Sequence, residues 1–542
     1  MGKKRKSIVL LALLSSILAF TACSSGETDG TKDKEKKEEP SQNSNLNPNG
    51  FPIVKEPISM TFFAPSAYSL DWNDVLVYNE YEKKTNIDIK WQMVNTTALA
   101  ERRNLALSSG EYPDALHSSG LSTRDLIMYG QQGTFIPLNS LIDKYAPNFK
   151  KLMETYPDIK RGITMPDGKI YSFPRIFDPQ FKSVLSGSKL WINNKFLQQV
   201  NMSEPQTIDQ FYNYLKAVKE RDLSGDGKMN EVPLQVTGDA VLVNILKGAY
   251  GLGNKGTGHP YVDLNPETKQ LRFIPTDPRY KELLQFLNKL YKEGLINQDL
   301  YTVKAEQIVA RANEGVFGSM VITNPKTAYN LDNYVGLPAL VGPHGDKLFS
   351  NVTPALVNTG GFVITNKNKH PEETVRWIDY FYGEEGSKLF FMGVKDVTYT
   401  EAPDGTVKYT DLINKNPDGL SFTAAISKYM TWRGISYPAI VKQKYFEGSE
   451  GHPDSIKAAE RLAPNYPAEV WAPFSYTIEE TEELSTMGAD IENYVKEMLA
   501  KFITGTASFD TWDQYVSTLN RMGLDRYMKT YKAAYDRYNA SK

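Results

Sequence analysis

A short loop rich in oxygen-bearing side chains carries the clearest sign of site chemistry in this chain of 542 residues. Side chains with oxygen atoms occupy its first, third, fifth, ninth and tenth positions, as Asp222, Ser224, Asp226, Asn230 and Glu231. Calcium takes roughly six to eight oxygen ligands, and a glycine at the sixth position permits the sharp turn that wraps the ion. Gly227 stands at that position, and Lys228 would contribute its backbone carbonyl. The spacing therefore predicts a calcium loop.

The loop differs from an EF-hand at the position of the last ligand. An EF-hand has a bidentate glutamate at the twelfth position, and this chain has Pro233 there. The same residues could also form an Asp-Gly turn with solvated carboxylates, and the sequence leaves that alternative open. In both cases we expect a structural role, because nothing in the neighbouring sequence suggests a catalytic water pocket.

The sequence lacks the common catalytic motifs. It contains no Gly-x-Ser-x-Gly elbow, no His-Glu-x-x-His pair and no Gly-x-x-x-x-Gly-Lys phosphate loop, and it has only five histidines. With 64 Asp and Glu residues, a pair of carboxylates could always be nominated for glycoside hydrolysis, which needs two carboxyl groups about 5 to 9.5 Å apart. Abundance alone does not make a site, so we expect a protein that is not an enzyme.

The first 22 residues have the three parts of an export signal. A basic stretch, Lys3–Lys6, precedes the apolar run Ile8–Phe20, which is too short for a membrane-spanning helix of roughly 20 apolar residues. The only cysteine, Cys23, follows this segment and resembles the lipidated cysteine of a bacterial lipoprotein. We expect cleavage before Cys23 and attachment of acyl chains such as palmitate. The alternative is a signal peptide that merely contains a cysteine.

Composition divides the rest of the chain into a tether and a folded body. Residues 23–52 carry many Ser, Asn, Gly, Lys and Glu residues and too few apolar side chains to fold, so a disordered tether is expected. The remaining body of about 490 residues is too large for one core and suggests two domains. Loss of the signal would change the net charge from −2 to −6, and no basic stripe suits a nucleic-acid partner.

Hydrophobic patterns predict an α/β protein. Residues 58–63 form an extended apolar run, residues 71–84 have helical periodicity, and residues 87–93 alternate apolar and polar side chains. A strand, a helix and a second strand in this order form a parallel unit, and ligands bind outside the carboxyl ends of such strands. The loop 65–71 is therefore a candidate wall of a binding site. Three further helices are expected from their start signals, at Thr207, Asp277 and Pro371.

Several short strings together resemble the family 1 extracellular solute-binding proteins. Their order and spacing match that family over most of the mature chain, and they are Gly110–Asp114, Gly133 with Pro137–Leu138, Asp167–Pro174, Leu190–Lys195, Pro205–Thr207 and Gly360–Phe362. The C-terminal extension Glu479–Lys542 is similar to that of larger members related to the alginate-oligosaccharide binders. The oxygen-rich loop is similar to the calcium loop of those binders, whose last ligand stands at the position of Glu231.

The resemblance implies an α/β, two-lobed periplasmic-binding-protein fold, type II-like, with central β-sheets flanked by helices and a helical C-terminal extension. We expect residues 53–185 with about 350–430 in lobe 1, and residues 186–349 with about 431–542 in lobe 2 and the C-terminal helices. Such lobes close on a ligand by hinge motion. The implied function is capture of an oligosaccharide on the extracytoplasmic face of the cell membrane for an ABC transporter. The permease subunits would be partners of a monomeric protein.

Aromatic and polar residues in family-like or non-helical segments are candidates for ligand contact, because sugar faces stack on aromatic rings and hydroxyls need hydrogen-bond partners. These candidates are Tyr68, Trp72, His117, Trp191, Trp432 and Arg433. Each of these residues could instead pack inside a lobe or belong to a capped loop. Three other tryptophans are expected in the core. Trp91 alternates in phase with Ile87 and Ile89, whereas Trp377 and Trp512 lie in predicted helical segments. The alternatives to a transport function are a lipid-anchored glycoside hydrolase or lyase, and a peptide or sensory receptor.

Replacement of Cys23 by serine tests the lipid anchor. We expect the Cys23→Ser protein to leave the membrane fraction or to remain unprocessed, because serine offers no thiol for acylation. Cell fractionation with immunoblotting measures both effects. Full membrane retention of a variant whose signal is cleaved normally would contradict the anchor.

Overall fold

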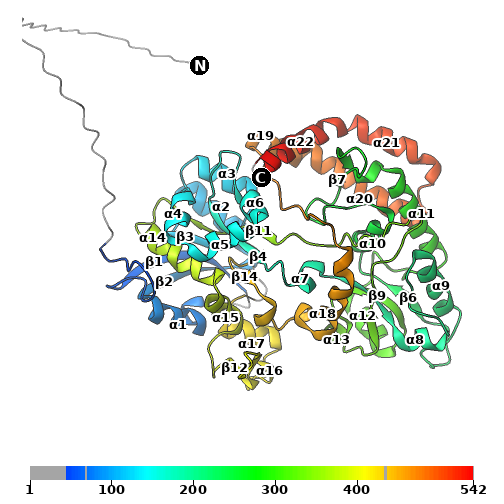
Figure 1. Cartoon of the computed structure of the whole chain (residues 1–542), viewed down its shortest axis with the longest axis horizontal. Helices are drawn as coiled ribbons and strands as arrows, with labels where there is room; N and C mark the ends of the chain where they lie inside the picture. Colours follow the sequence, from blue (N-terminus) through cyan, green and yellow to red (C-terminus); the bar gives the residue numbers. More distant parts are fainter. Residues whose placement is uncertain (1–43, 68–69, 433–435, 541–542) are drawn as a thin grey trace, which may run out of the picture. The chain divides into compact units, whose positions relative to one another are not determined.

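The computed structural model describes residues 44–67, 70–432 and 436–540 (Figure 1). This part of the chain contains two large β-sheets. Their strands all lie in the unit Asn45–Lys542. The predictions for Cys23, Tyr68 and Arg433 fall outside the described residues. None of the described helices is long and apolar enough to cross a membrane.

The first sheet has six strands in the order β14-β4-β11-β3-β1-β2. They are β1 (Ile58–Ser66), β2 (Ile87–Asn95), β3 (Ala115–Leu121), β4 (Ser172–Phe177), β11 (Leu356–Ile364) and β14 (Ile440–Val441). β1 is parallel to β2 and β3, β14 is parallel to β4, and β11 is antiparallel to both β3 and β4. The predicted strand-helix-strand unit is confirmed as β1, α1 (Leu76–Thr85) and β2.

Helices from two parts of the chain accompany the first sheet. They are α2 (Leu99–Ser109), α3 (Thr123–Gln131), α4 (Asn139–Tyr145), α5 (Pro147–Thr155), α6 (Pro157–Ile163), α14 (Pro371–Asp379), α15 (Glu384–Met392), α16 (Asp411–Asn414) and α17 (Phe422–Tyr429), with the hairpin β12 (Tyr399–Glu401) and β13 (Val407–Tyr409). In the core, Phe62 packs edge-on against Trp91, Phe362 and Trp377 with ring centres 5.4 to 5.7 Å apart. The predicted core positions of Trp91 and Trp377 are therefore confirmed.

The second sheet has four strands in the order β10-β5-β9-β6. They are β5 (Lys189–Asn193), β6 (Val232–Gln235), β9 (Phe317–Ile322) and β10 (Tyr334–Gly336). β6 is parallel to β9, whereas β5 is antiparallel to both β9 and β10. The accompanying elements are α8 (Asn194–Gln199), α9 (Ile208–Lys219), α10 (Asp239–Leu246), α11 (Pro278–Lys292), α12 (Ala305–Glu314), α13 (Pro325–Tyr329), α18 (Pro453–Leu462) and the hairpin β7 (Val262–Leu264) and β8 (Leu271–Phe273).

The three predicted helix starts are confirmed, and two of these helices have side-chain caps, whereas α14 begins at Pro371 without one. The side chain of Thr207 accepts a hydrogen bond from the backbone N–H of Gln210 at the start of α9. The side chain of Asp277 caps α11, which begins at Pro278. Such caps satisfy backbone N–H groups that have no partner within the helix.

The chain passes between the two sheets through segments that hydrogen-bond to one another. The first segment leaves β4 at Phe177 and enters β5 at Lys189, and it contains the short helix α7 (Lys182–Ser186). In the segment before β11, Asn351 Nδ2 donates to the carbonyls of Ser186 and Ser188, at 3.5 and 2.9 Å. Further bonds between crossing segments join Thr353 to Leu185 and Tyr466 to Lys182. These bonds hold the crossing segments side by side.

The C-terminal helices contact elements that accompany both sheets (Figure 1). They are α19 (Ile478–Glu483), α20 (Ala489–Thr504), α21 (Trp512–Arg521) and α22 (Leu524–Ala540). Asn288 in α11 donates to the carbonyls of Phe502 and Ile503 in α20. In α6, the guanidinium carbon of Arg161 lies 4.4 Å from the ring centre of Tyr538 in α22. The expected assignment of these helices to lobe 2 therefore describes only part of their contacts.

The expected boundary near residue 430 also differs from the sheet topology. β14 pairs with β4, so Ile440–Val441 belongs to the first sheet and not to the second. A strand of two residues is too short to give a periodic signal in the sequence. The hydrophobic pattern of the sequence therefore could not show that the chain returns to the first sheet at Ile440–Val441.

Replacing Asn351 by alanine tests the contact between crossing segments. Loss of its two hydrogen bonds should lower the free energy of unfolding by about 1 to 3 kcal/mol, because the carbonyls of Ser186 and Ser188 lose a donor. Urea unfolding measures the change, with Asn520→Ala on the exposed face of α21 as the control. Equal, small effects of the two substitutions would contradict the proposed importance of this contact.

Candidate functional site

The crossing segments meet both sheets at the carboxyl ends of parallel strands. The chain leaves the first sheet at the end of β4, and β11 begins at that edge with Leu356 opposite Ile176. In the second sheet, Lys189 at the start of β5 lies opposite Ile322 at the end of β9. Ligands of α/β sheets bind outside the carboxyl ends of the strands. These two carboxyl edges are therefore the candidate ligand-binding site.

A polar pair stands at the carboxyl edge of the first sheet. Asn358 in β11 lies opposite Arg175 in β4. The guanidinium carbon of Arg175 lies 4.8 Å from the ring centre of Phe177 and 4.6 Å from that of Tyr437. Sequence reasoning missed this pair. The signal that could have found it is an arginine within the apolar strand Ser172–Phe177, on the face that also carries Phe177.

The predicted tryptophan contacts are packed inside the protein. Trp72 is 3% exposed, and its ring centre lies 5.0 Å from that of Trp91. Trp432 is also 3% exposed, and its Nε1 donates to the carbonyl of Phe391. Trp191 is buried and donates to a carbonyl of β9. The structure shows core packing for these rings, and their contact with a ligand stays a prediction.

His117 is buried within β3. Its Nδ1 lies 2.9 Å from Oγ of Ser118, and its ring meets that of Trp72 edge-on. Burial lowers the pKa of His117 to about 3, so the imidazole is neutral at physiological pH. Ser118 has a φ of 55°, in the left-handed region that non-glycine residues seldom adopt. The contact of His117 with a ligand also stays a prediction.

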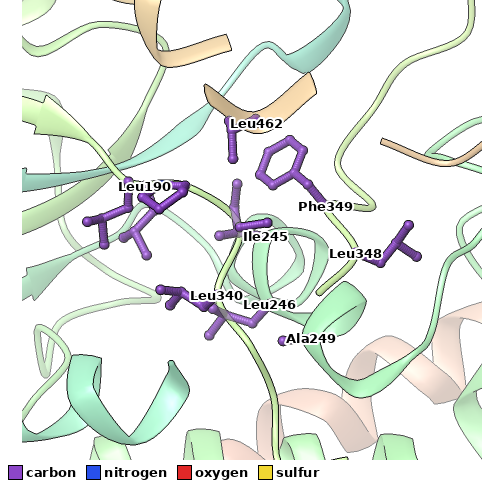
Figure 2. Close-up of a pocket in the computed structure, with 11 residues that line it drawn as sticks. Leu190, Ile245, Leu246, Ala249, Leu340, Leu348, Phe349 and Leu462 are labelled. Carbon is purple, nitrogen blue, oxygen red and sulfur yellow. The ribbon is translucent and has the colours of Figure 1, made fainter. Parts of the chain in front are cut away.

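Two cavities are poor candidates for a carbohydrate. One of about 160 Å³ lies beside Trp72 and Trp91 and is lined by Ile87–Trp91, nearer the amino end of β2 than its carboxyl end. The other measures about 20 Å³, roughly the space of one water molecule. Figure 2 shows the residues that surround it, and their side chains are all apolar. They are Leu190, Ile245, Leu246, Ala249, Leu337, Pro338, Ala339, Leu340, Leu348, Phe349 and Leu462. It offers no side-chain partner for a hydroxyl.

The predicted calcium loop turns around its own carboxylates. Asp222 accepts backbone hydrogen bonds from Gly225 at 2.7 Å and Gly227 at 2.9 Å, and these bonds lower its pKa. Both glycines have a positive φ, 84° and 82°, which glycine adopts without strain. Asp226 accepts from the backbone N–H of Lys228. The sharp turn expected at the sixth position is therefore confirmed.

Two oxygen atoms at the end of this loop lack partners. Oε1 of Glu231 accepts from the backbone N–H groups of Leu223 and Ser224. Oε2 of Glu231 and Oδ1 of Asn230 are buried and find no hydrogen-bond partner among the described residues. A buried oxygen without a partner is unfavourable, and a cation would satisfy both. Within the described ranges, no three His, Cys, Asp or Glu side chains are grouped to hold a metal ion.

Comparison with known protein families shows which family the chain belongs to. The model of the bacterial extracellular solute-binding proteins matches residues 71–388, more than half of the chain. The chain belongs to this family. This solute-binding protein is 28% identical over 556 residues to FusA, a fructooligosaccharide ABC transporter substrate-binding protein of Streptococcus pneumoniae serotype 4, covering 99% of this chain and 98% of FusA. It is 26% identical to the lipoprotein LipO of Bacillus subtilis, covering 84% of this chain and 87% of LipO.

Solved structures share the fold of this solute-binding protein. FusA of S. pneumoniae in complex with kestose has a TM-score of 0.70 and 26% identity, covering 90% of this chain and 100% of that one. An HMO-binding, ABC-transporter-associated solute-binding protein of Bifidobacterium longum infantis has a TM-score of 0.74 at 20% identity, covering 89% of this chain and 99% of that one. The predicted family and the two-lobed α/β fold with a type II-like arrangement are confirmed.

Loss of His117 should reduce the acid sensitivity of this solute-binding protein. Its folded pKa of about 3 lies below the ordinary 6.5, so the unfolded state binds more protons between these values. Stability therefore falls as the pH falls from about 6.5 towards 3. In His117→Gln this contribution is absent, and the free energy of unfolding should fall less between about pH 7 and pH 4.5 than in the wild type. Urea unfolding at both pH values measures the difference, and equal losses would contradict the assignment.

Proposed function

We propose that this protein binds an oligosaccharide outside the cytoplasmic membrane and presents it to an ABC importer. The observation that carries the proposal is the similarity to FusA over nearly the full length of both chains. Membership of the solute-binding family supports it. Polar side chains at the carboxyl edges of the sheets would supply the partners that sugar hydroxyls need. The permease subunits of the importer would be its partners, and the protein would act as a monomer.

The proposed role is binding without catalysis. The family of the chain consists of solute-binding proteins, and the sequence carries none of the catalytic motifs considered above. A glycoside hydrolase or lyase would release shortened sugars, whereas a peptide or sensory receptor would bind other ligands. The fate and the identity of the ligand therefore separate these classes.

The proposed location is the outer face of the cell membrane, with Cys23 as the lipidated residue. The signal-like segment before Cys23 supports this anchor, and the relative LipO is a lipoprotein. Acyl chains, palmitate among them, would hold the protein at the membrane. The predicted tether 23–52 is too long at its end, because Asn45 and the residues after it belong to the folded unit and Phe51 packs edge-on against Tyr81 and Tyr380. Residues 23–44 would separate the folded body from the lipid surface.

A structural calcium ion is part of the proposal. The ligands would be the side chains of Asp222, Ser224, Asp226, Asn230 and Glu231 with the carbonyl of Lys228. The two unpaired oxygens at the end of the loop support this assignment. FusA has been solved as an EF-hand mutant in complex with fructo-nystose, so that relative carries a loop of the EF-hand type. The ion would cross-link the loop, and no chemical step is assigned to it.

The proposed ligand contacts from the sequence fall into two groups. Trp72, His117, Trp191 and Trp432 are packed in the core, so their rings would have to become accessible before they could touch a sugar. Tyr68 and Arg433 are proposed from the sequence alone. Because Trp72 and Trp432 are packed, alanine at either position would leave a cavity and cost about 3 to 5 kcal/mol of stability.

An oligosaccharide should stabilise the mature protein and be recovered unchanged. A ligand that binds only the folded state adds about 2.7 kcal/mol of stability at one hundred times its dissociation constant. Thermal unfolding with kestose, maltotriose and trigalacturonate measures binding, and mass spectrometry of the recovered sugar measures cleavage. Shortened products would place the protein among the hydrolases or lyases. Stabilisation by peptides but by no sugar would indicate the receptor class.

Calcium should stabilise the protein through the loop Asp222–Glu231. We expect chelation with EGTA to lower the melting temperature of the wild type and to have little effect on Asp226→Ala, which has lost one proposed ligand. Calorimetry with and without calcium measures the shift. Asp513→Ala on the exposed side of α21 is the matched control and should respond as the wild type does. An identical response of all three proteins would show that the loop is only a turn.

A further inference from the structure

Arg175 is held in place at the carboxyl edge of the first sheet without a carboxylate partner. The rings of Phe177 and Tyr437 flank its guanidinium group, with ring centres 4.8 and 4.6 Å from the guanidinium carbon. Cation–π contacts position the group but use none of its N–H donors. Among the described residues, no carboxylate pairs with Arg175, and its Nε is shielded from solvent with no hydrogen-bond partner. The side chain is therefore positioned by packing, and its donor capacity is unused.

Asn358 places an unused acceptor beside this guanidinium group. It lies directly opposite Arg175 across β11 and β4, and such cross-strand neighbours have their Cβ atoms about 4.5 to 5.5 Å apart on one face. The shielded Oδ1 of Asn358 finds no hydrogen-bond partner within the described ranges. The register of β11 shifts on both sides of Asn358. Such irregularities redirect side chains and are frequent beside functional sites.

The carboxyl edge of the second sheet carries a similar acceptor. Gln235 is the last residue of β6 and is 3% exposed. Its Nε2 donates to the carbonyl of Val236 at 2.9 Å. Its Oε1 has no partner in the described part of the chain. Both candidate edges thus hold a buried amide oxygen that can accept a hydrogen bond.

We propose that Arg175 and Asn358 form a subsite for two neighbouring hydroxyl groups of a sugar residue. This inference rests on the proposed oligosaccharide-binding function and defines the chemistry of its ligand. The guanidinium N–H groups donate to the hydroxyl oxygens, and one hydroxyl donates its hydrogen to Oδ1 of Asn358. The planar fork of an arginine suits two adjacent oxygen atoms. The pair therefore selects a sugar by the positions of its hydroxyl groups and by which of them donates or accepts a hydrogen bond.

The unpaired Oδ1 of Asn358 distinguishes a pair of hydroxyl groups from a carboxylate as the bound group. An arginine alone could bind the carboxylate of an acidic sugar in a bidentate manner. An ionised carboxylate has no hydrogen to donate, so Oδ1 of Asn358 would remain unpaired and would face a negative charge. A hydroxyl group both donates and accepts. A hydroxyl pair satisfies Arg175 and Oδ1 of Asn358 together, so the sugar residue bound at this subsite presents hydroxyl groups to the pair.

The substitution Asn358→Asp tests this assignment directly. The new carboxylate would pair with Arg175 in the free protein, so the ligand would have to compete with an internal ion pair. We expect the affinity for the bound sugar to fall by about tenfold to hundredfold, while the melting temperature stays unchanged or rises. Arg175→Lys should cause a similar loss of affinity, because lysine lacks the fork. The control is Arg311→Lys, whose wild-type residue pairs with Asp299 and should not affect binding.

Isothermal titration calorimetry with kestose, maltotriose and trigalacturonate provides the readout, with calcium present throughout. Support requires wild-type binding of a sugar, weaker binding in both test variants and normal binding in the control. Wild-type affinity in the two variants for every sugar that the wild type binds would overturn the subsite and leave the proposed function standing. A lower melting temperature of Asn358→Asp would also overturn it, because the predicted ion pair would be absent. No binding of any sugar by the wild type would overturn the proposed function itself and the subsite with it.

Discussion

Hydrogen bonds within and between the crossing segments fix the chain where it meets the carboxyl edges of the two sheets. The amide of Asn351 ties one segment to another, and the buried ammonium of Lys189 donates to the carbonyls of Ser183 and Gly187. Burial lowers the pKa of Lys189 to about 8. Because the crossings leave and enter the sheets at their carboxyl edges, any hinge motion of the lobes would pivot beside these edges. The polar groups of β4, β6 and β11 are therefore next to the part of the chain that would move.

The candidate site keeps polar atoms that stability alone would not favour. Buried polar groups are nearly always paired in proteins, because an unpaired group loses its hydrogen bonds to water. Arg175, Asn358 and Gln235 each keep such an atom among the described residues. The predicted calcium loop has the same property at Asn230 and Glu231. Local violations of this kind are expected at functional sites, and here they mark both the proposed sugar subsite and the proposed metal site.

The sequence predicted those features that depend on local patterns. The β1-α1-β2 unit follows from hydrophobic periodicity, and the turn at Gly227 follows from the need for a positive φ. The position of β14 and the pairing of Arg175 with Asn358 depend on contacts between distant segments, which periodicity does not contain. For the same reason, a tryptophan beside a predicted loop could not be assigned to the core or to the ligand. Trp72 follows the end of β1, yet its ring packs against Trp91.

A crystal structure of the mature protein with a bound oligosaccharide is the most direct test of this account. We expect an intact sugar at the carboxyl edges of the two sheets, with adjacent hydroxyl groups in hydrogen-bond contact with Arg175 and Asn358. A sugar bound beside the cavity at the amino end of β2, or a cleaved sugar at any position, would contradict it.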